Sequence, residues 1–200
     1  MAAPIRRRTR AREIAMQVLF QLDLRGRDYP NEIGTTVAEL CRSEWLAEHD
    51  RDQRQQSEPE AGRTATAKRT KADADAADAI AFAQRLVEGT LEHQDEIDRR
   101  LQAVARNWDL KRMAIVDRNV MRVAAYELIW CDDVPPKVAI NEAIEIGKKF
   151  STANSGGFVN GLLDRIRIDL EQERRSGAAA PPANGAAPDK AAGAADAEQG

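Results

Sequence analysis

The N-terminal segment carries five arginines and no acidic residue: Arg6, Arg7, Arg8, Arg10 and Arg12. Guanidinium groups match the geometry of phosphates and stack on nucleobases, so this segment is typical of nucleic-acid binding. Charge alone fits a solubilising tail equally well. Gln17 could read base edges and Phe20 offers a ring for stacking, with packing of Phe20 against the core as the alternative.

A second basic group, Lys148-Lys149, is followed by small and polar residues that include Ser151, Ser155 and the pair Gly156-Gly157. Cations in the last turn of a helix complement its dipole, which is a purely structural explanation for the lysines. Small residues with free backbone donors also allow a phosphate chain to approach closely. By itself this pattern is a weak indication of a second anion-binding segment.

Patterns for metal binding or catalysis are missing from the sequence. The two histidines, His49 and His93, have no partner at metal-ligand spacing, and Cys41 and Cys131 form no CxxC pair. Without an export signal, the two cysteines are expected to be buried thiols rather than a disulfide.

Two weaker catalytic patterns also fail. Gly156 and Gly161 have the spacing of a phosphate loop, but leucines follow where that loop needs Lys and Ser or Thr. Glu142 and Glu145 are interpreted as a solvated acidic edge rather than an acid–base pair. We therefore expect a protein that is not an enzyme, with no cofactor, no metal and no small-molecule substrate.

Charge is unevenly distributed over the 200 residues, although the formal net charge is only −3. The basic N-terminus precedes an acidic body, and this asymmetry favours a nucleic-acid partner. No apolar run approaches the ~18 residues of a membrane span, and the amphipathic N-terminus argues against a signal peptide. The expected location is the cytoplasm.

Two segments lack the side chains that build a core. Residues 47–76 contain no Val, Ile, Leu, Met, Phe, Tyr or Trp, and residues 176–200 consist mostly of Ala, Gly and Pro. Neither can bury enough apolar area to offset the entropy of ordering, so both are expected to be disordered or loosely helical. The predicted organisation is a flexible basic arm (1–9), one helical domain (10–175) interrupted by the polar insertion, and a disordered tail.

Helical periodicity dominates the remaining sequence, and no alternation of strands and helices is seen. Seven amphipathic helices are expected, and they imply a compact all-α bundle. Their apolar positions fall within residues 10–24, 33–45, 78–91, 97–108, 111–128, 139–150 and 158–170. Pro135-Pro136 can begin the sixth helix because proline is tolerated in a first turn.

Several motifs resemble the bacterial transcription antitermination factors of the NusB family. The N-terminal pattern is Arg10-Ala11-Arg12-Glu13 with Gln17 and Phe20. The C-terminal half contains Val116-Asp117-Arg118, Tyr126-Glu127-Leu128, Asp133-Val134-Pro135, Asn141-Glu142-Ala143 and Phe158-Val159-Asn160-Gly161. The similarity runs in order through nearly all of the foldable residues, and its last two motifs are the most specific.

The resemblance implies an all-helical fold of two sub-bundles and a non-enzymatic role in transcription antitermination. Its implied partners are single-stranded boxA RNA of ribosomal RNA leaders, the ribosomal protein NusE and, indirectly, other Nus factors and RNA polymerase. Helices four and five and the loop at 132–135 would face NusE. The implied RNA contacts are Arg6, Arg7, Arg8, Arg10, Arg12, Gln17, Phe20, Lys148, Ser151, Ser155, Phe158 and Asn160.

The polar insertion and the C-terminal tail depart from the family pattern. Two alternatives stay open at this stage. One is a helical protein-interaction module whose arginines are incidental. The other is a stand-alone relative of the RNA-binding domain of ribosomal RNA cytosine methyltransferases, although the large catalytic domain of those enzymes has no counterpart in this sequence.

Overall fold

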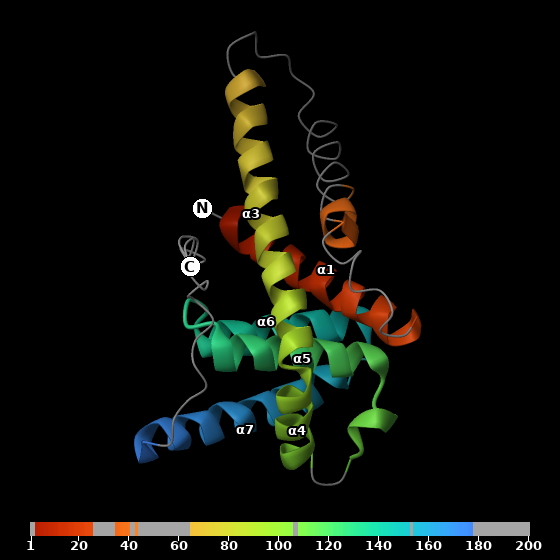
Figure 1. Cartoon of the computed structure of the whole chain (residues 1–200), viewed down its shortest axis with the longest axis vertical. Helices are drawn as coiled ribbons and strands as arrows, with labels where there is room; N and C mark the ends of the chain where they lie inside the picture. The colour runs from red at the N-terminus through yellow and green to blue at the C-terminus, as the bar shows by residue number, and fades with distance from the viewer. Residues whose placement is uncertain are drawn as a thin grey trace, which may run out of the picture.

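A computed structural model describes residues 3–25, 35–40, 43, 65–105, 108–152 and 154–177, with side chains from Arg7 in the first helix and from Ala77 in the third. The described part is helical and contains no strand, as the sequence predicts. Its elements are α1 (Ala3–Arg25), α3 (Ala65–Glu92), α4 (Gln94–Val104), η2 (Leu110–Arg112), α5 (Ile115–Trp130), α6 (Pro136–Phe150) and α7 (Ser155–Ser176) (Figure 1). Residues 35–40 form a further short helical segment.

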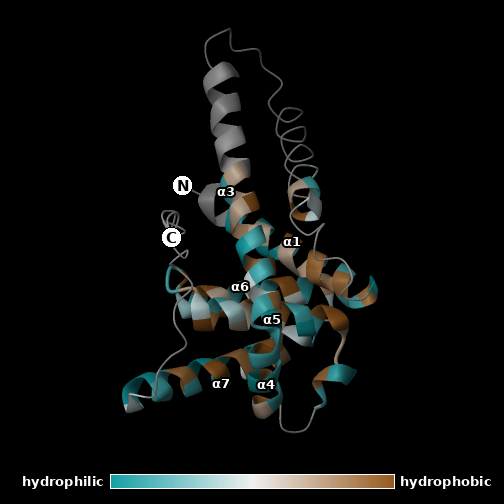
Figure 2. Ribbon diagram, in the orientation of Figure 1, coloured by the Kyte–Doolittle hydropathy of each residue, from teal (hydrophilic) through white to brown (hydrophobic). Residues whose placement is uncertain are grey.

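The helices form two groups that share α5. Helix α1 packs along α3, while α4, α6 and α7 pack around α5, which also contacts α1 and α3 (Figure 1). Each helix has an apolar stripe and a polar outer face, so brown and teal alternate along the ribbons in Figure 2. Because α5 is covered by neighbours, every residue from Asn119 to Trp130 is buried.

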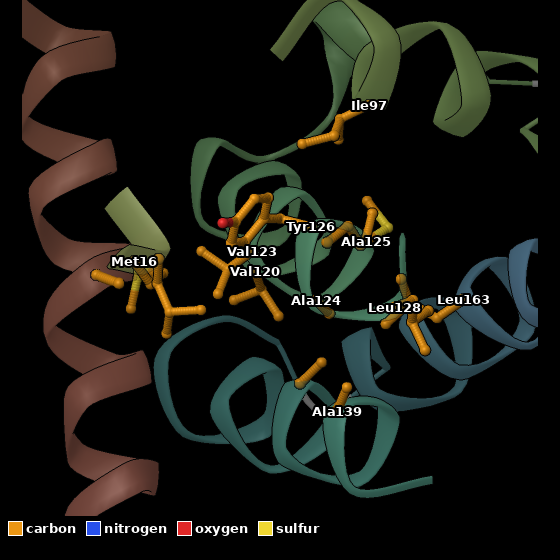
Figure 3. Close-up of a cluster of buried hydrophobic side chains, with 14 of the residues drawn as sticks. Met16, Ile97, Val120, Val123, Ala124, Ala125, Tyr126, Leu128, Ala139 and Leu163 are labelled. Carbon is orange, nitrogen blue, oxygen red and sulfur yellow. The ribbon is translucent and has the colours of Figure 1, made fainter. Parts of the chain in front are cut away.

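The core is built on α5 from side chains that all the surrounding helices contribute. In Figure 3, Val120 and Val123 of α5 lie toward Met16 of α1, Ala124 faces Ala139 of α6, and Leu128 lies beside Leu163 of α7. A buried ionic cluster reinforces it, in which Arg122 donates to Asp98 at 2.7 Å and to Asp23 at 3.1 Å. This cluster joins the end of α1 to α4 and α5.

The N-terminus differs from the prediction. Residues 3–9 belong to α1, whereas the sequence analysis treated residues 1–9 as a flexible arm and began the helix at Arg10. Arginine is a good helix former, so a basic segment can extend a helix that is anchored downstream by buried Ala11, Ile14 and Ala15. The arginines therefore stand on a helix, and their spacing decides which way each one faces.

The polar insertion also differs in part. Residues 65–76 form the first turns of α3, where the sequence analysis expected disorder or a loose helix up to residue 76 and a regular helix from about Asp78. This stretch is rich in alanine, which has the highest helix propensity and can extend a helix without burying large side chains. Residues 47–64 and 178–200 lie outside the described residues.

Smaller shifts occur around the connections. Trp108 and Met113, predicted to lie in helices, flank η2, which begins where the side chain of Asp109 accepts from the backbone N–H of Lys111 at 2.9 Å. Helix α6 begins at Pro136 as predicted, and α7 begins at Ser155, earlier than expected. Cys131 is a free, buried thiol as expected, and burial raises its pKa to about 11.

Candidate nucleic-acid interface

Helix α1 separates its arginines onto two different faces. A helix repeats every 3.6 residues, so Arg10, Glu13 and Gln17 follow one stripe, while Arg8 and Arg12 follow another on the opposite side. The contacts agree with this geometry. Arg10 pairs with Glu13 along the first stripe, whereas Arg8 and Arg12 both lie over the ring of a residue in α3. A segment that looks uniform in sequence thus serves two surfaces.

The first stripe meets the C-terminal end of α6. Lys149 Nζ lies 2.7 Å from Glu13 Oε1 and 4.9 Å from the ring centroid of Phe150. Glu13 is buried and faces two cations, Arg10 and Lys149, so this junction keeps a positive excess. Lys148 is exposed and pairs with Glu145 at 2.8 Å. The two basic segments of the sequence therefore lie side by side.

Two side chains farther along the stripe remain partly accessible. Gln17 and Phe20 are half-buried, and Phe20 lies toward the end of α1. That end is next to the start of α5, because Arg118 Nη2 donates to Asp23 Oδ2 at 2.9 Å (Figure 1). The stripe thus extends from the basic junction toward the first turns of α5.

The loop between α6 and α7 is held by Ser155. The Ser155 hydroxyl accepts from the Thr152 backbone N–H at 3.1 Å and donates to Asp117 Oδ2 of α5 at 3.2 Å. Ser155 is buried, so its side chain lies in the interior, whereas the RNA contact predicted for it requires an accessible side chain. Ser151 is half-buried and Asn160 is exposed on this side of the loop.

Trp108 is a surface aromatic that the sequence analysis placed in a helix. Its side chain is 59% exposed, and its ring meets the half-buried Phe158 edge-on at 5.9 Å between centroids. Gln102 fixes the loop by donating to the Trp108 carbonyl at 2.9 Å and accepting from Leu110 N–H at 3.0 Å. An aromatic held rigidly in solvent can stack on a base or a partner side chain. Asn107 and Asp109, whose residue types favour turns, are the sequence signal that could have indicated a helix end before Trp108.

Arg12 is buried and takes part in the interior of the fold. It is 3% exposed, and its Nε and Nη2 donate to Glu127, which is 1% exposed, at 2.8–3.0 Å. Glu142 lies 3.6 Å from Arg12 Nη1, so Glu142 is not the solvated edge that its spacing with Glu145 suggested. Burial raises the pKa of Glu127, against the lowering effect of Arg12. The structure therefore places Arg12 in the interior, whereas the RNA contact predicted for it requires an accessible side chain.

The second face of α1 is closed by α3 and by the loop before α6. Asp133 Oδ1 accepts from Arg85 Nη2 at 2.6 Å, and Arg8 Nη1 lies 3.5 Å from Oδ2 of the same carboxylate. Burial opposes ionisation of Asp133, but the hydrogen bond and charge of Arg85 outweigh it, so the pKa of Asp133 lies below its ordinary value. Arg85 was not identified from sequence, because nothing near it in the chain marks it as part of a basic site.

Two further features concern metal-ligating side chains and the apolar character of the helices in the described part of the chain. No three His, Cys, Asp or Glu side chains there are grouped so that they could hold a metal ion. None of the helices described combines the length and apolar character that crossing a membrane requires.

A family model for the NusB family matches residues 46–167. The chain is 39% identical over 166 residues to the transcription antitermination protein NusB of Myxococcus xanthus, an alignment that covers 83% of this chain and 97% of that relative. The chain belongs to the NusB family. NusB of Desulfatibacillum aliphaticivorans is 50% identical over 99 residues, which cover 50% of this chain and 69% of the relative.

Solved NusB structures have the same fold. NusB of T. maritima superposes with a TM-score of 0.57 at 33% identity, covering 81% of this chain and 91% of that one. A chain from the crystal structure of antitermination factors NusB and NusE in complex with dsRNA superposes with a TM-score of 0.58 at 25% identity. The match covers 82% of this chain and 98% of that one. These matches confirm the all-helical NusB architecture expected from the motifs.

Within this NusB fold, most of the predicted site residues come together. Two of them, Arg12 and Ser155, are buried, and the side chain of Arg6 lies outside the described part of the structure. Arg7 and Arg8 belong to the groove side of α1. The others lie along the first stripe, at the end of α6 or at the start of α7: Arg10, Gln17, Phe20, Lys148, Ser151, Phe158 and Asn160. We call this set, with Lys149 and Trp108, the α1–α6–α7 surface.

Proposed function

We propose that this protein is a non-enzymatic, RNA-binding transcription antitermination factor of the cytoplasm. It binds single-stranded boxA RNA of ribosomal RNA leaders together with ribosomal protein NusE, and through other Nus factors it helps assemble the antitermination complex on RNA polymerase. Membership in the NusB family supports this role. The proposed RNA site is the α1–α6–α7 surface.

The contact between Lys149 and Glu13 is the observation that carries the proposal. In this contact the stripe of α1 lies beside the basic end of α6. The α6–α7 loop leads from there to Phe158, whose ring meets Trp108. A single strand crossing this surface would meet cations first and aromatic rings next. Cations hold phosphates and rings stack on unpaired bases, which is how proteins recognise single-stranded RNA.

The test is RNA binding by the full-length chain, measured by fluorescence anisotropy over a salt series. The probe is a labelled single-stranded boxA RNA, with the same sequence as a duplex for comparison and with NusE absent or present. Arg10→Ala should weaken binding and reduce the slope of log affinity against log salt by about 0.7, the value for one phosphate contact on a single strand.

Arg167→Ala is the matched control. Arg167 pairs with Asp164 three residues away, as Arg10 pairs with Glu13, and the two arginines are similarly exposed, at 27% and 29%. The control should leave the salt slope unchanged. Wild-type protein that binds NusE but no boxA RNA, with or without that partner, would instead identify a protein-interaction module.

A further inference from the structure

A basic groove lies between α1 and α3, on the face of α1 opposite to the stripe. Its volume is about 400 Å³, and among the residues whose side chains are described its polar lining consists of Arg7, Arg8 and Arg85 with one acid, Asp78. The remaining lining comes from Phe82 and two alanines. This volume is in the range of small-ligand sites, and the lining favours an anion.

Phe82 fixes the guanidinium groups of the groove. The guanidinium carbons of Arg8 and Arg85 lie 4.8 Å and 5.4 Å from its ring centroid, and Arg12 lies over the same ring at 5.3 Å. Guanidinium groups over an aromatic face are attracted to it and lose side-chain freedom. Two of the three remain exposed enough to bind a ligand, because only Arg12 is fully buried.

A single carboxylate, that of Asp133, bridges the two exposed guanidinium groups. Asp133 presents one oxygen to Arg85 at 2.6 Å and the other to Arg8 at 3.5 Å. The side chains of Arg8 and Asp133 are 51% and 44% exposed, so solvent reaches this bridge. Arginines hold a phosphodiester in the same way, with guanidinium groups placed around two of its oxygens.

We propose that this groove binds a phosphodiester group of the RNA, and that Arg8 and Arg85 transfer their hydrogen bonds from Asp133 to the phosphate oxygens. Asp133 then acts as an internal competitor that keeps the two arginines oriented while the groove is empty. Arg85, Phe82 and Asp133 are the residues newly assigned to RNA binding. The proposal rests on the proposed function, because the strand on the α1–α6–α7 surface is the one whose next phosphates reach the groove.

Position favours RNA over an acidic peptide. Arg8 and Arg10 are two residues apart on α1, so the groove and the stripe flank the same turn of helix. A strand that follows the stripe toward the N-terminus of α1 can curve around this turn of the helix and reach the groove on its other face. The groove would therefore add affinity only for RNA long enough to extend beyond the stripe.

The test compares charge-matched variants of two ion pairs. Arg85→Gln and Asp133→Asn alter the groove, while Arg165→Gln and Asp169→Asn alter an exposed pair on α7 with a 3.1 Å separation. Affinity for single-stranded boxA RNA, with and without a flanking extension, is measured over a salt series. Arg85→Gln should lower affinity for the extended RNA and reduce its salt slope by about 0.7. Asp133→Asn should raise affinity, because the competing carboxylate is gone.

Arg85→Lys guards against a folding artefact. Lysine keeps the charge but lacks the planar fork, so this variant should retain the salt slope while affinity for the extended RNA falls. Helicity and thermal unfolding are followed for every variant. If Asp133→Asn weakens RNA binding, as loss of Arg85 does, then Asp133 only anchors the arginine and the exchange is wrong.

Two further outcomes separate this inference from the proposed function. If wild-type protein binds boxA RNA and Arg10→Ala weakens it, while Arg85→Gln behaves like Arg165→Gln, the groove proposal fails and the function stands. If Arg85→Gln weakens NusE binding but leaves RNA binding unchanged, the groove is a protein-docking site. If wild-type protein binds no RNA, both fail together.

Discussion

Replacing Arg12 by alanine should damage the fold itself. The substitution leaves Glu127, which is 1% exposed, without the guanidinium that donates to both of its oxygens. Removing one partner of a buried ion pair costs about 3–5 kcal/mol, which is a large part of the ~5–15 kcal/mol by which a domain is stable. At about 2–4 °C per kcal/mol for a domain of this size, the melting temperature should fall by about 6–20 °C.

Thermal unfolding followed by circular dichroism measures this loss, and pH gives an internal check. Burial raises the pKa of Glu127 in the folded state, so the folded protein holds this proton at a pH where the unfolded chain has released it. Stability therefore falls as the pH rises through that window. Arg12 is the main group that stabilises the charged form of Glu127 and so lowers its pKa. The loss of stability in Arg12→Ala should therefore become smaller as the pH is lowered and Glu127 takes up a proton.

A double substitution distinguishes lost pairing from lost packing. Arg12→Met with Glu127→Leu removes both charges while keeping apolar volume, and it should recover much of the stability that Arg12→Ala loses. The reasoning would be refuted if Arg12→Ala left the melting temperature unchanged and weakened only RNA binding. In that case Arg12 would be a surface contact, as the resemblance implied.

Three smaller predictions test other parts of the fold. Gly89→Ala should destabilise the protein by about 1–3 kcal/mol in denaturant unfolding, because a Cβ at this position overlaps the Tyr126 ring; an unchanged midpoint would refute that packing. In a Cys41→Ser background, Cys131 should resist iodoacetamide at pH 8 until the protein unfolds, since a pKa of about 11 leaves about one thiol in a thousand ionised. Ser155→Ala should cost about 1–3 kcal/mol through the unpaired polar groups that it leaves. RNA affinity of the folded Ser155→Ala protein should remain that of wild type, and a loss would restore Ser155 to the interface.

The sequence predicted the fold well where apolar periodicity and turn chemistry coincide. Helix α6 is an example, because Pro136 marks its first turn and two lysines occupy its last. Prediction was less definite at α3, where the lack of large apolar residues in 65–76 indicated disorder or a loose helix, whereas the structure has a regular helix there. Alanine-rich sequence can continue a helix that is anchored elsewhere, and that anchor at Phe82 and Leu86 lies several turns downstream.

The candidate site was predictable as a set of segments but not residue by residue. The chemistry of arginine and the family motifs pointed to the right helices. They could not reveal that Arg12 forms a buried ion pair with Glu127, because the two residues are 115 positions apart and meet only in the packed fold. The same holds for Arg85, whose role depends on Asp133, 48 positions away. Long-range pairing of charges decides which cations remain at the surface.

The spacing of arginines on α1 gives one helix three separate tasks. Arg10 lies on the stripe beside α6, Arg8 faces the groove against α3, and Arg12 is buried with Glu127. If these arginines were replaced together, one measurement would combine weaker RNA binding at the stripe, weaker RNA binding at the groove and lower stability of the fold. Single substitutions separate the three effects. Arg10→Ala should change the salt slope for short RNA, whereas Arg8→Ala should change it only for extended RNA. Arg12→Ala should lower the melting temperature. A uniform effect of all three on RNA binding, with stability unchanged, would mean that these residues act as one flexible basic arm.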